Sequence, residues 1–126
     1  MLSVQPWRRA CTLAALACTV IGAMAQADGA VPSAVLFVST RSGNAQIHAM
    51  RADGSGDRAL TQTPQENTEP VASPDGRRIA FTSYRDGNAE IYVMNVDGSS
   101  QRRLTDHPAA DSAPAWLPDG RIVFRS

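Results

Sequence analysis

The sequence predicts an all-β fold built from β-propeller blades of four antiparallel strands, arranged as an incomplete ring. Two observations predict it. The chain repeats itself with a period of about 44 residues: segment 35–77 aligns without a gap on 79–121, and about twenty of the aligned pairs are identical. Each repeat also contains four short strand-like segments separated by turns rich in Gly and Pro, which is typical of one blade. A helical repeat is excluded, because no segment shows apolar residues at helical spacing.

The strands of the complete blade follow from alternating side chains. In Ala89–Asn95, Ile91 and Val93 lie on one face, while Tyr92 and Met94 lie on the other. Apolar residues on both faces indicate a strand that is covered on both sides. The predicted strands of this blade, from the inner to the outer, are Glu69–Ser73, Arg78–Ser83, Ala89–Asn95 and Gln101–Thr105.

The flanking copies contribute fewer strands. About two and a third blades are present in total. The first copy is predicted to lack its inner strand, and the third copy is predicted to hold only its two inner strands. The predicted strands are Val35–Thr40, Gln46–Arg51 and Asp57–Thr61 before the complete blade, and Ala113–Leu117 and Arg121–Ser126 after it.

The turns between these strands have a clear physical basis. In Pro74-Asp75-Gly76, Pro fixes φ, Asp hydrogen-bonds to nearby backbone, and Gly adopts the positive φ that other residues resist. Asp86-Gly87-Asn88 forms the next turn. Replacing Gly76 or Gly87 by Val is therefore expected to destabilise the fold.

The first 25 residues resemble a secretory signal peptide. Arg8 and Arg9 precede an apolar run that closes on Ala23-Met24-Ala25, a small-x-small cleavage pattern. Cleavage is predicted after Ala25, with Ala27 as the alternative, and residues 26–34 then form a short linker. The run is about 16 residues long, whereas a membrane span needs about 20. The alternative of a buried helix is disfavoured, because nothing caps the segment.

Both cysteines, Cys11 and Cys18, lie inside the predicted signal peptide. Cys18 is a weak candidate for a lipid anchor: Ala15 occupies the position where bacterial lipoprotein signals favour Leu, and the apolar run continues beyond the cysteine. Cleavage after Ala25 would leave a mature chain without thiols or disulfides in an oxidising compartment.

The composition argues against nucleic acid as a partner. The 126 residues include 12 basic and 12 acidic side chains, and the formal net charge is zero. Binding to nucleic acid or to an anionic membrane surface requires a basic excess. All the basic side chains are arginine.

The repeat resembles that of TolB-type β-propellers, which are WD-repeat-like. The residues that carry the resemblance are PVASPDGRRIAFTSYRDGNAEIYVMNVDGSSQRRLT and PAWLPDGRIVF, within 35–126. It implies an exported, periplasmic, non-catalytic module for protein–protein binding at the cell envelope, with a peptidoglycan-associated lipoprotein as the implied partner. The alternative is the propeller part of an exported prolyl-oligopeptidase-like peptidase or oligogalacturonate lyase. The resemblance departs from TolB itself, because no α/β domain precedes the blades here.

The domain organisation predicted from these patterns is a signal peptide (1–25), a linker (26–34) and TolB-like repeats (35–77, 78–120 and a partial 121–126). A closed ring needs more blades than these, and a blade buries its faces only against neighbours. Three interpretations stay open: a truncated gene product, a ring completed by self-association, or an open fragment.

No catalytic, metal or cofactor site is predicted, and the binding residues stay unassigned. Divergent loops at Gln62–Glu69 and Asp106–Ala113 are the expected binding elements. Ser55 lies in a hairpin turn that lacks the pattern of a nucleophile elbow. His48, which aligns with Tyr92, is expected to be packed and hydrogen-bonded. Other polar and aromatic residues are expected to have structural roles. These are the lone His107, the edge arginines Arg58, Arg102 and Arg103, the blade-packing Trp116, and the turn aspartates Asp53, Asp75, Asp86, Asp97, Asp106 and Asp119.

Overall fold

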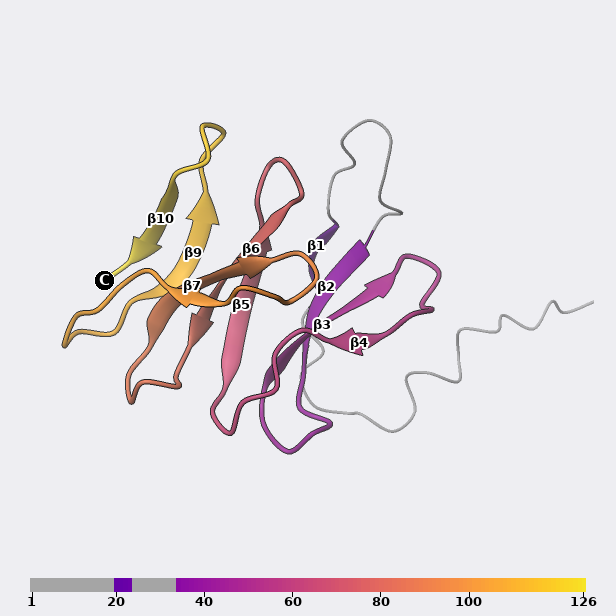
Figure 1. The fold of residues 1–126 in the computed structure, drawn as a ribbon, viewed down its shortest axis with the longest axis horizontal. Helices are drawn as coiled ribbons and strands as arrows, with labels where there is room; N and C mark the ends of the chain where they lie inside the picture. The colour runs from indigo at the N-terminus through magenta and orange to yellow at the C-terminus, as the bar shows by residue number, and fades with distance from the viewer. Residues whose placement is uncertain (1–19, 24–33) are drawn as a thin grey trace, which may run out of the picture.

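The computed structural model describes residues 20–23 and 34–126, and all the regular structure in these residues is β-strand. The strands form three antiparallel sheets that follow one another along the chain, from β1–β4 on the right of Figure 1 to β9–β10 on the left. We call these sheets blade 1 (β1–β4), blade 2 (β5–β8) and blade 3 (β9–β10). The predicted fold class, an incomplete ring of propeller blades, is confirmed.

Blade 1 has four strands: β1 (Val20–Ala23), β2 (Ala34–Ser39), β3 (Gln46–Arg51) and β4 (Arg58–Ala59). The expectation that this blade lacks an inner strand is wrong, because β1 pairs with β2 in antiparallel register. The β-branched pair Val20-Ile21 favours an extended backbone, which the reading of this segment as a signal peptide did not take into account.

Blade 2 is the complete blade that the repeat predicted. Its strands are β5 (Asn67–Ala72), β6 (Arg78–Ser83), β7 (Glu90–Asn95) and β8 (Arg102–Arg103). The outer strand β8 is shorter than predicted. The backbone N–H of Ile91 donates to the hydroxyl of Thr105 at 2.9 Å, whereas a longer strand would offer it a backbone carbonyl. Side-chain capping thus ends the ladder.

Blade 3 contains β9 (Ser112–Trp116) and β10 (Ile122–Arg125), which pair in antiparallel register with a bulge. Both predicted strands are present. The inner strand begins one residue earlier than predicted, and Ala113 within it has a φ of +54°. The same irregularity interrupts β5, where Glu69 has a φ of +53°.

The core lies between blades 1 and 2. One face of blade 1 packs against one face of blade 2, and the aromatic rings of Phe81 and Tyr92 lie 5.7 Å apart within it. Stacked blades bury apolar faces that neither sheet could bury alone. The buried side chains of this cluster are Leu36, Ile47, Ala49 and Leu60 from blade 1, and Ile79, Phe81, Tyr92 and Met94 from blade 2.

The predicted turns adopt the backbone that their glycines require. Gly76 has a φ of +68° and Gly87 a φ of +98°. Asp75 accepts the backbone N–H of Arg77 at 3.1 Å, as expected for the Pro-Asp-Gly turn. The bond from the Ser73 hydroxyl is the main reason that the pKa of the exposed Asp75 carboxyl is lowered.

The predicted signal peptide and linker lie largely outside the described residues and stay predictions. Strand β1 belongs to the segment that predicted cleavage after Ala25 would remove. In the part of the chain that the structure describes, no helix is long and apolar enough to cross a membrane.

Candidate functional site

The two divergent loops lie at the same place in successive blades, and equivalent asparagines hold both of them. Asn44, in the β2–β3 turn, donates its amide to the carbonyls of Thr63 (3.1 Å) and Pro64 (2.6 Å). Asn88, in the β6–β7 turn, donates in the same way to His107 (2.8 Å) and Ala109 (3.2 Å). The turns and the clamped loops form one surface, which we call the loop face.

The side chains of these loops point to solvent while their backbone is fixed. Residues 64–66 of the first loop and 106–110 of the second are exposed. The two loops share a proline at equivalent positions, Pro64 and Pro108, but differ at the residues around it. A fixed backbone with variable exposed side chains is how scaffolds present binding residues.

A hollow of about 900 Å³ opens beside the first loop. Most of the residues that line it have polar side chains, although apolar atoms form the larger part of its surface. It lies against blade 1, between the β2–β3 turn and the start of the β4–β5 connection. Hydrogen-bonding groups therefore stand among apolar surface, a combination that suits a peptide-like partner with both polar groups and apolar side chains. The lining includes Arg41, Asn44, Gln46, His48, Thr61 and Thr63.

His48 borders this hollow and is held by its neighbours. Its Nδ1 lies 3.0 Å from Oδ1 of Asp57, its ring centroid lies 5.4 Å from that of Phe37, and the residue is 7% exposed. The prediction of a packed, hydrogen-bonded histidine is confirmed. Burial raises the pKa of Asp57, but the bonds from His48 and Arg41 outweigh it and leave that pKa lowered.

Blade 2 has a denser ionic cluster around Arg103. Arg103 donates Nη2 to the fully buried Glu90 at 2.8 Å and pairs with Asp106 at 2.9 Å and Asp86 at 3.7 Å. Glu90 also accepts the Thr105 hydroxyl at 2.5 Å. Burial raises the pKa of Glu90, and the bonds from Thr105 and Arg103 more than compensate, so the pKa is lowered.

Tyr92 occupies the place of His48 one repeat later. Its hydroxyl donates to Asp86, and the guanidinium of Arg85 lies 4.4 Å from its ring centroid. Burial, followed by the hydrogen bond to Asp86, raises the pKa of Tyr92 to about 12. Arg85 continues the network through Nη2 to Asn67 (3.1 Å) and Gln101 (2.9 Å).

The turn aspartates divide into two groups. Asp53, Asp75, Asp97 and Asp119 each accept a backbone N–H two residues later, as predicted for turn residues. The carboxylates of Asp86 and Asp106 pair with Arg103 instead. Asp86 still lies in the predicted β6–β7 turn, where the Gly87 N–H donates to the Tyr84 carbonyl at 3.3 Å, whereas the predicted turn role is wrong for Asp106. Sequence spacing gives no signal for Asp86, because Arg103 reaches it from the outer strand β8, whereas Asp106 follows Arg103 by three residues.

The other residues considered from the sequence take structural positions. Ser55 donates its hydroxyl to Asp53 at 2.7 Å, which fits a hairpin turn. His107 is exposed and accepts the Ala109 N–H at 3.1 Å. Trp116 donates its indole N–H to the Val71 carbonyl at 3.1 Å, which ties blade 3 to blade 2. Arg58 and Arg102 lie exposed on the outer strands, unlike Arg103.

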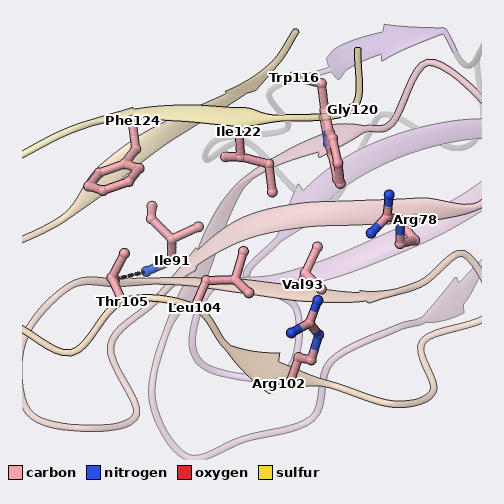
Figure 2. A pocket seen from close by; sticks show the side chains of 10 residues that line it. All are labelled: Arg78, Ile91, Val93, Arg102, Leu104, Thr105, Trp116, Gly120, Ile122 and Phe124. Atoms are coloured by element: carbon pink, nitrogen blue, oxygen red, sulfur yellow. Dashed lines mark hydrogen bonds between the residues drawn. The ribbon is translucent and has the colours of Figure 1, made fainter. Parts of the chain in front are cut away.

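A second cavity, of about 300 Å³, separates blade 2 from blade 3. In Figure 2, Ile122 and Phe124 of β10 and Trp116 of β9 lie on one side, while Ile91, Val93 and Leu104 lie on the other. The guanidinium of Arg78 lies 5.0 Å from the Trp116 ring centroid at one end. We call this cavity the inter-blade groove.

Among residues 20–23 and 34–126, no group of three or more His, Cys, Asp or Glu side chains lies together in a way that could hold a metal ion. Neither the asparagine clamps nor the Glu90–Arg103 pair was predicted from the sequence. The recurrence of Asn44 as Asn88 in the two aligned turns was a signal for the clamps. The second had no sequence signal, because Gln46 occupies the position of Glu90 in the preceding repeat.

Comparison with known proteins agrees with this geometry. Residues 46–126 match the family described as the Tricorn protease N-terminal beta propeller domain. The chain belongs to this family. No curated protein sequence matches it.

Solved structures show that this propeller chain is TolB-like. A TolB-type protein from Agrobacterium tumefaciens is 36% identical with a TM-score of 0.67, over 72% of this chain and 33% of that one. TolB from Acinetobacter baumannii is 26% identical with a TM-score of 0.61, over 72% of this chain and 23% of that one. The TolB-like propeller described here therefore spans a third or less of the length of these proteins, and the predicted family resemblance is confirmed.

Proposed function

We propose that this TolB-like propeller is an exported, non-catalytic module that binds a protein partner at the bacterial cell envelope through its loop face. The observation that carries the proposal is the pair of asparagine clamps. Asn44 and Asn88 fix two divergent loops in equivalent positions, so the scaffold is constant while the exposed side chains vary.

The periplasm is the proposed location. The charged start, the apolar run and the small-x-small end of residues 1–25 support export. The likeness to TolB proteins supports it as well, because that family acts in the periplasm. The implied partner is a peptidoglycan-associated lipoprotein, which TolB propellers bind.

A loop exchange tests the binding proposal. Exchanging residues 62–66 with 106–110 moves the side chains but keeps both clamps, because each asparagine bonds to backbone carbonyls. The probe is the purified peptidoglycan-associated lipoprotein of Agrobacterium tumefaciens, with binding measured by calorimetry. We expect the wild type to bind and the exchanged variant to lose at least about tenfold in affinity, since hot-spot contacts dominate interfaces. Absence of binding by the wild type, or equal binding by both, would refute the proposal.

A second candidate is favoured by one observation: the family match is to the propeller of a protease. In that case these blades are the non-catalytic part of an exported peptidase, or of an oligogalacturonate lyase, and the catalytic groups lie in another domain. The nucleotide sequence of the source locus beyond the codon for Ser126 separates the two candidates. Further repeats without a catalytic domain support the binding module, and a downstream hydrolase or lyase domain supports the enzyme.

A further inference from the structure

The inter-blade groove is a blade–blade contact of which only the inner half is filled by the described residues. Leu104 aligns with Leu60 of the preceding repeat, yet Leu60 is 5% exposed and Leu104 is 39% exposed. Leu60 lies in a cluster with Tyr92 and Met94 of β7. In blade 3, Ile122 and Phe124 take the places of Ile79 and Phe81, and the groove lies where counterparts of Tyr92 and Met94 would pack.

A buried carboxylate marks the same edge. Asp111, which directly precedes β9, is 2% exposed, and within the described residues its Oδ1 has no hydrogen-bond partner. In the preceding repeat the aligned residue is Asn67, whose Oδ1 accepts Nη2 of Arg85 at 3.1 Å. Burying a carboxylate without a partner is costly. The edge therefore has a place for an arginine that sits as Arg85 does, in the turn that follows the second strand of a blade.

Blade 1 carries the matching residues. Arg41 aligns with Arg85, and each donates Nε to the equivalent serine, Ser39 or Ser83, at 2.8 Å. The guanidinium of Arg41 also pairs with Asp57. Strands β2 and β3 of blade 1 carry an aromatic, an imidazole and a thioether side chain. These side chains occupy the positions at which blade 2 carries the side chains that contact blade 1. The aligned pairs are Phe37 with Phe81, His48 with Tyr92 and Met50 with Met94.

We propose that a second copy of this chain completes blade 3. Strand β9 of one copy pairs with β2 of the next, in the position that β1 holds here. Arg41 of that copy then reaches Asp111, and its His48 and Met50 cover Leu104 and the groove. Strand β10, in which Val123 and Phe124 are 47% and 44% exposed, then gives up its pairing with β9 to the incoming β2. This inference rests on the proposed export, because cleavage after Ala25 removes β1 and frees the edge of β2.

Charge complementarity between Arg41 and Asp111 makes the contact testable. The full chain, with its own leader, is expressed in a Gram-negative host, the periplasmic product is purified, and its mass is measured by light scattering over a range of concentrations. We expect an oligomer. Asp111→Arg or Arg41→Asp should each lower the self-association constant by at least about tenfold, because each places like charges opposite one another.

The double variant, R41D with D111R, should recover association, and Asp111→Asn should retain it, as Asn67 does with Arg85. Glu66→Arg reverses an exposed charge on the loop face and should leave the mass unchanged. A monomeric wild type that begins at residue 26 overturns the inference and leaves export intact. So does an oligomer that Asp111→Arg does not weaken, or a double variant that folds and stays monomeric. A retained leader, found by N-terminal sequencing, refutes the proposed export and with it this assembly.

Discussion

Glu69 and Ala113 hold the same position in successive repeats, and the carboxylate of the first accepts the backbone N–H of the second at 2.8 Å. Both residues have a left-handed backbone, with φ of +53° and +54°. The same Oε2 of Glu69 also accepts the hydroxyl of Thr82 at 2.7 Å. One side chain at a bulge in β5 therefore connects the inner strand of blade 3 to two strands of blade 2.

We expect Glu69→Ala to loosen blade 3. It leaves the Ala113 N–H and the buried Thr82 hydroxyl without their acceptor, which costs about 1–3 kcal/mol of unfolding free energy. Urea unfolding measures the cost, and amide exchange in β9 and β10 locates it. Glu69→Gln keeps an acceptor oxygen and should cost less. Equal stability of the wild type and the alanine variant would show that this connection does not stabilise the fold.

Gly98 should tolerate alanine less well than Gly54 does. The two align, with φ of +90° and +84°, so both substitutions strain the backbone similarly. A Cβ on Gly98 would lie 2.9 Å from the carbonyl oxygen of Leu60 in blade 1, whereas one on Gly54 meets nothing within 4 Å. Gly98→Ala should therefore cost roughly 1–3 kcal/mol more than Gly54→Ala. Thermal unfolding of both variants tests this, and similar losses would contradict the close approach of blades 1 and 2.

Gly76→Val should destabilise the Pro-Asp-Gly turn by about 1–3 kcal/mol, because a β-branched residue resists a φ of +68°. Gly76→Asn is the matched control, since asparagine adopts this left-handed region more readily. Melting temperatures should fall in the order wild type, Asn, Val. A valine variant as stable as the asparagine variant would mean that the turn relaxes to another backbone.

Glu90 should make the free energy of unfolding depend on pH in the acid range. Its pKa is lowered in the folded protein, so its contribution is present above the ordinary carboxyl pKa and is lost as pH falls through the lowered value. Glu90→Gln places the residue found at the aligned position, Gln46, and removes the titrating group. From about pH 5 to pH 3, the wild type should lose stability more steeply than this variant. Parallel stability curves over that interval would show that Glu90 does not contribute.

Much of the fold was predictable from the sequence because the repeat places equivalent residues in equivalent environments. The span Arg78–Ser83 was predicted to the residue, since Ile79 and Phe81 alternate between clear turns. The ends of β8 were not, because a ladder ends where Thr105 replaces a backbone acceptor. Strand β1 was missed, because an apolar segment near the N-terminus fits an export signal as well as it fits a strand.

The candidate site was less predictable. The divergent loops Gln62–Glu69 and Asp106–Ala113 stood out in the alignment, but the clamps by Asn44 and Asn88 depend on backbone carbonyls about 20 residues away, which turn propensities do not describe. The pairing of Asp86 was also decided at a distance, by Arg103 on the outer strand.

Local alternation and residues a few positions apart set the all-β class, the blade period, the antiparallel strand order and the turns with positive φ, so all of these could be predicted from the sequence. Which polar groups meet depends on how the sheets stack. The tertiary structure brought Arg103 to Glu90, aimed Glu69 at the next blade and left Asp111 buried without a partner for Oδ1. Such contacts join strands and blades, and their free energy depends on burial and geometry that appear only when the sheets stack.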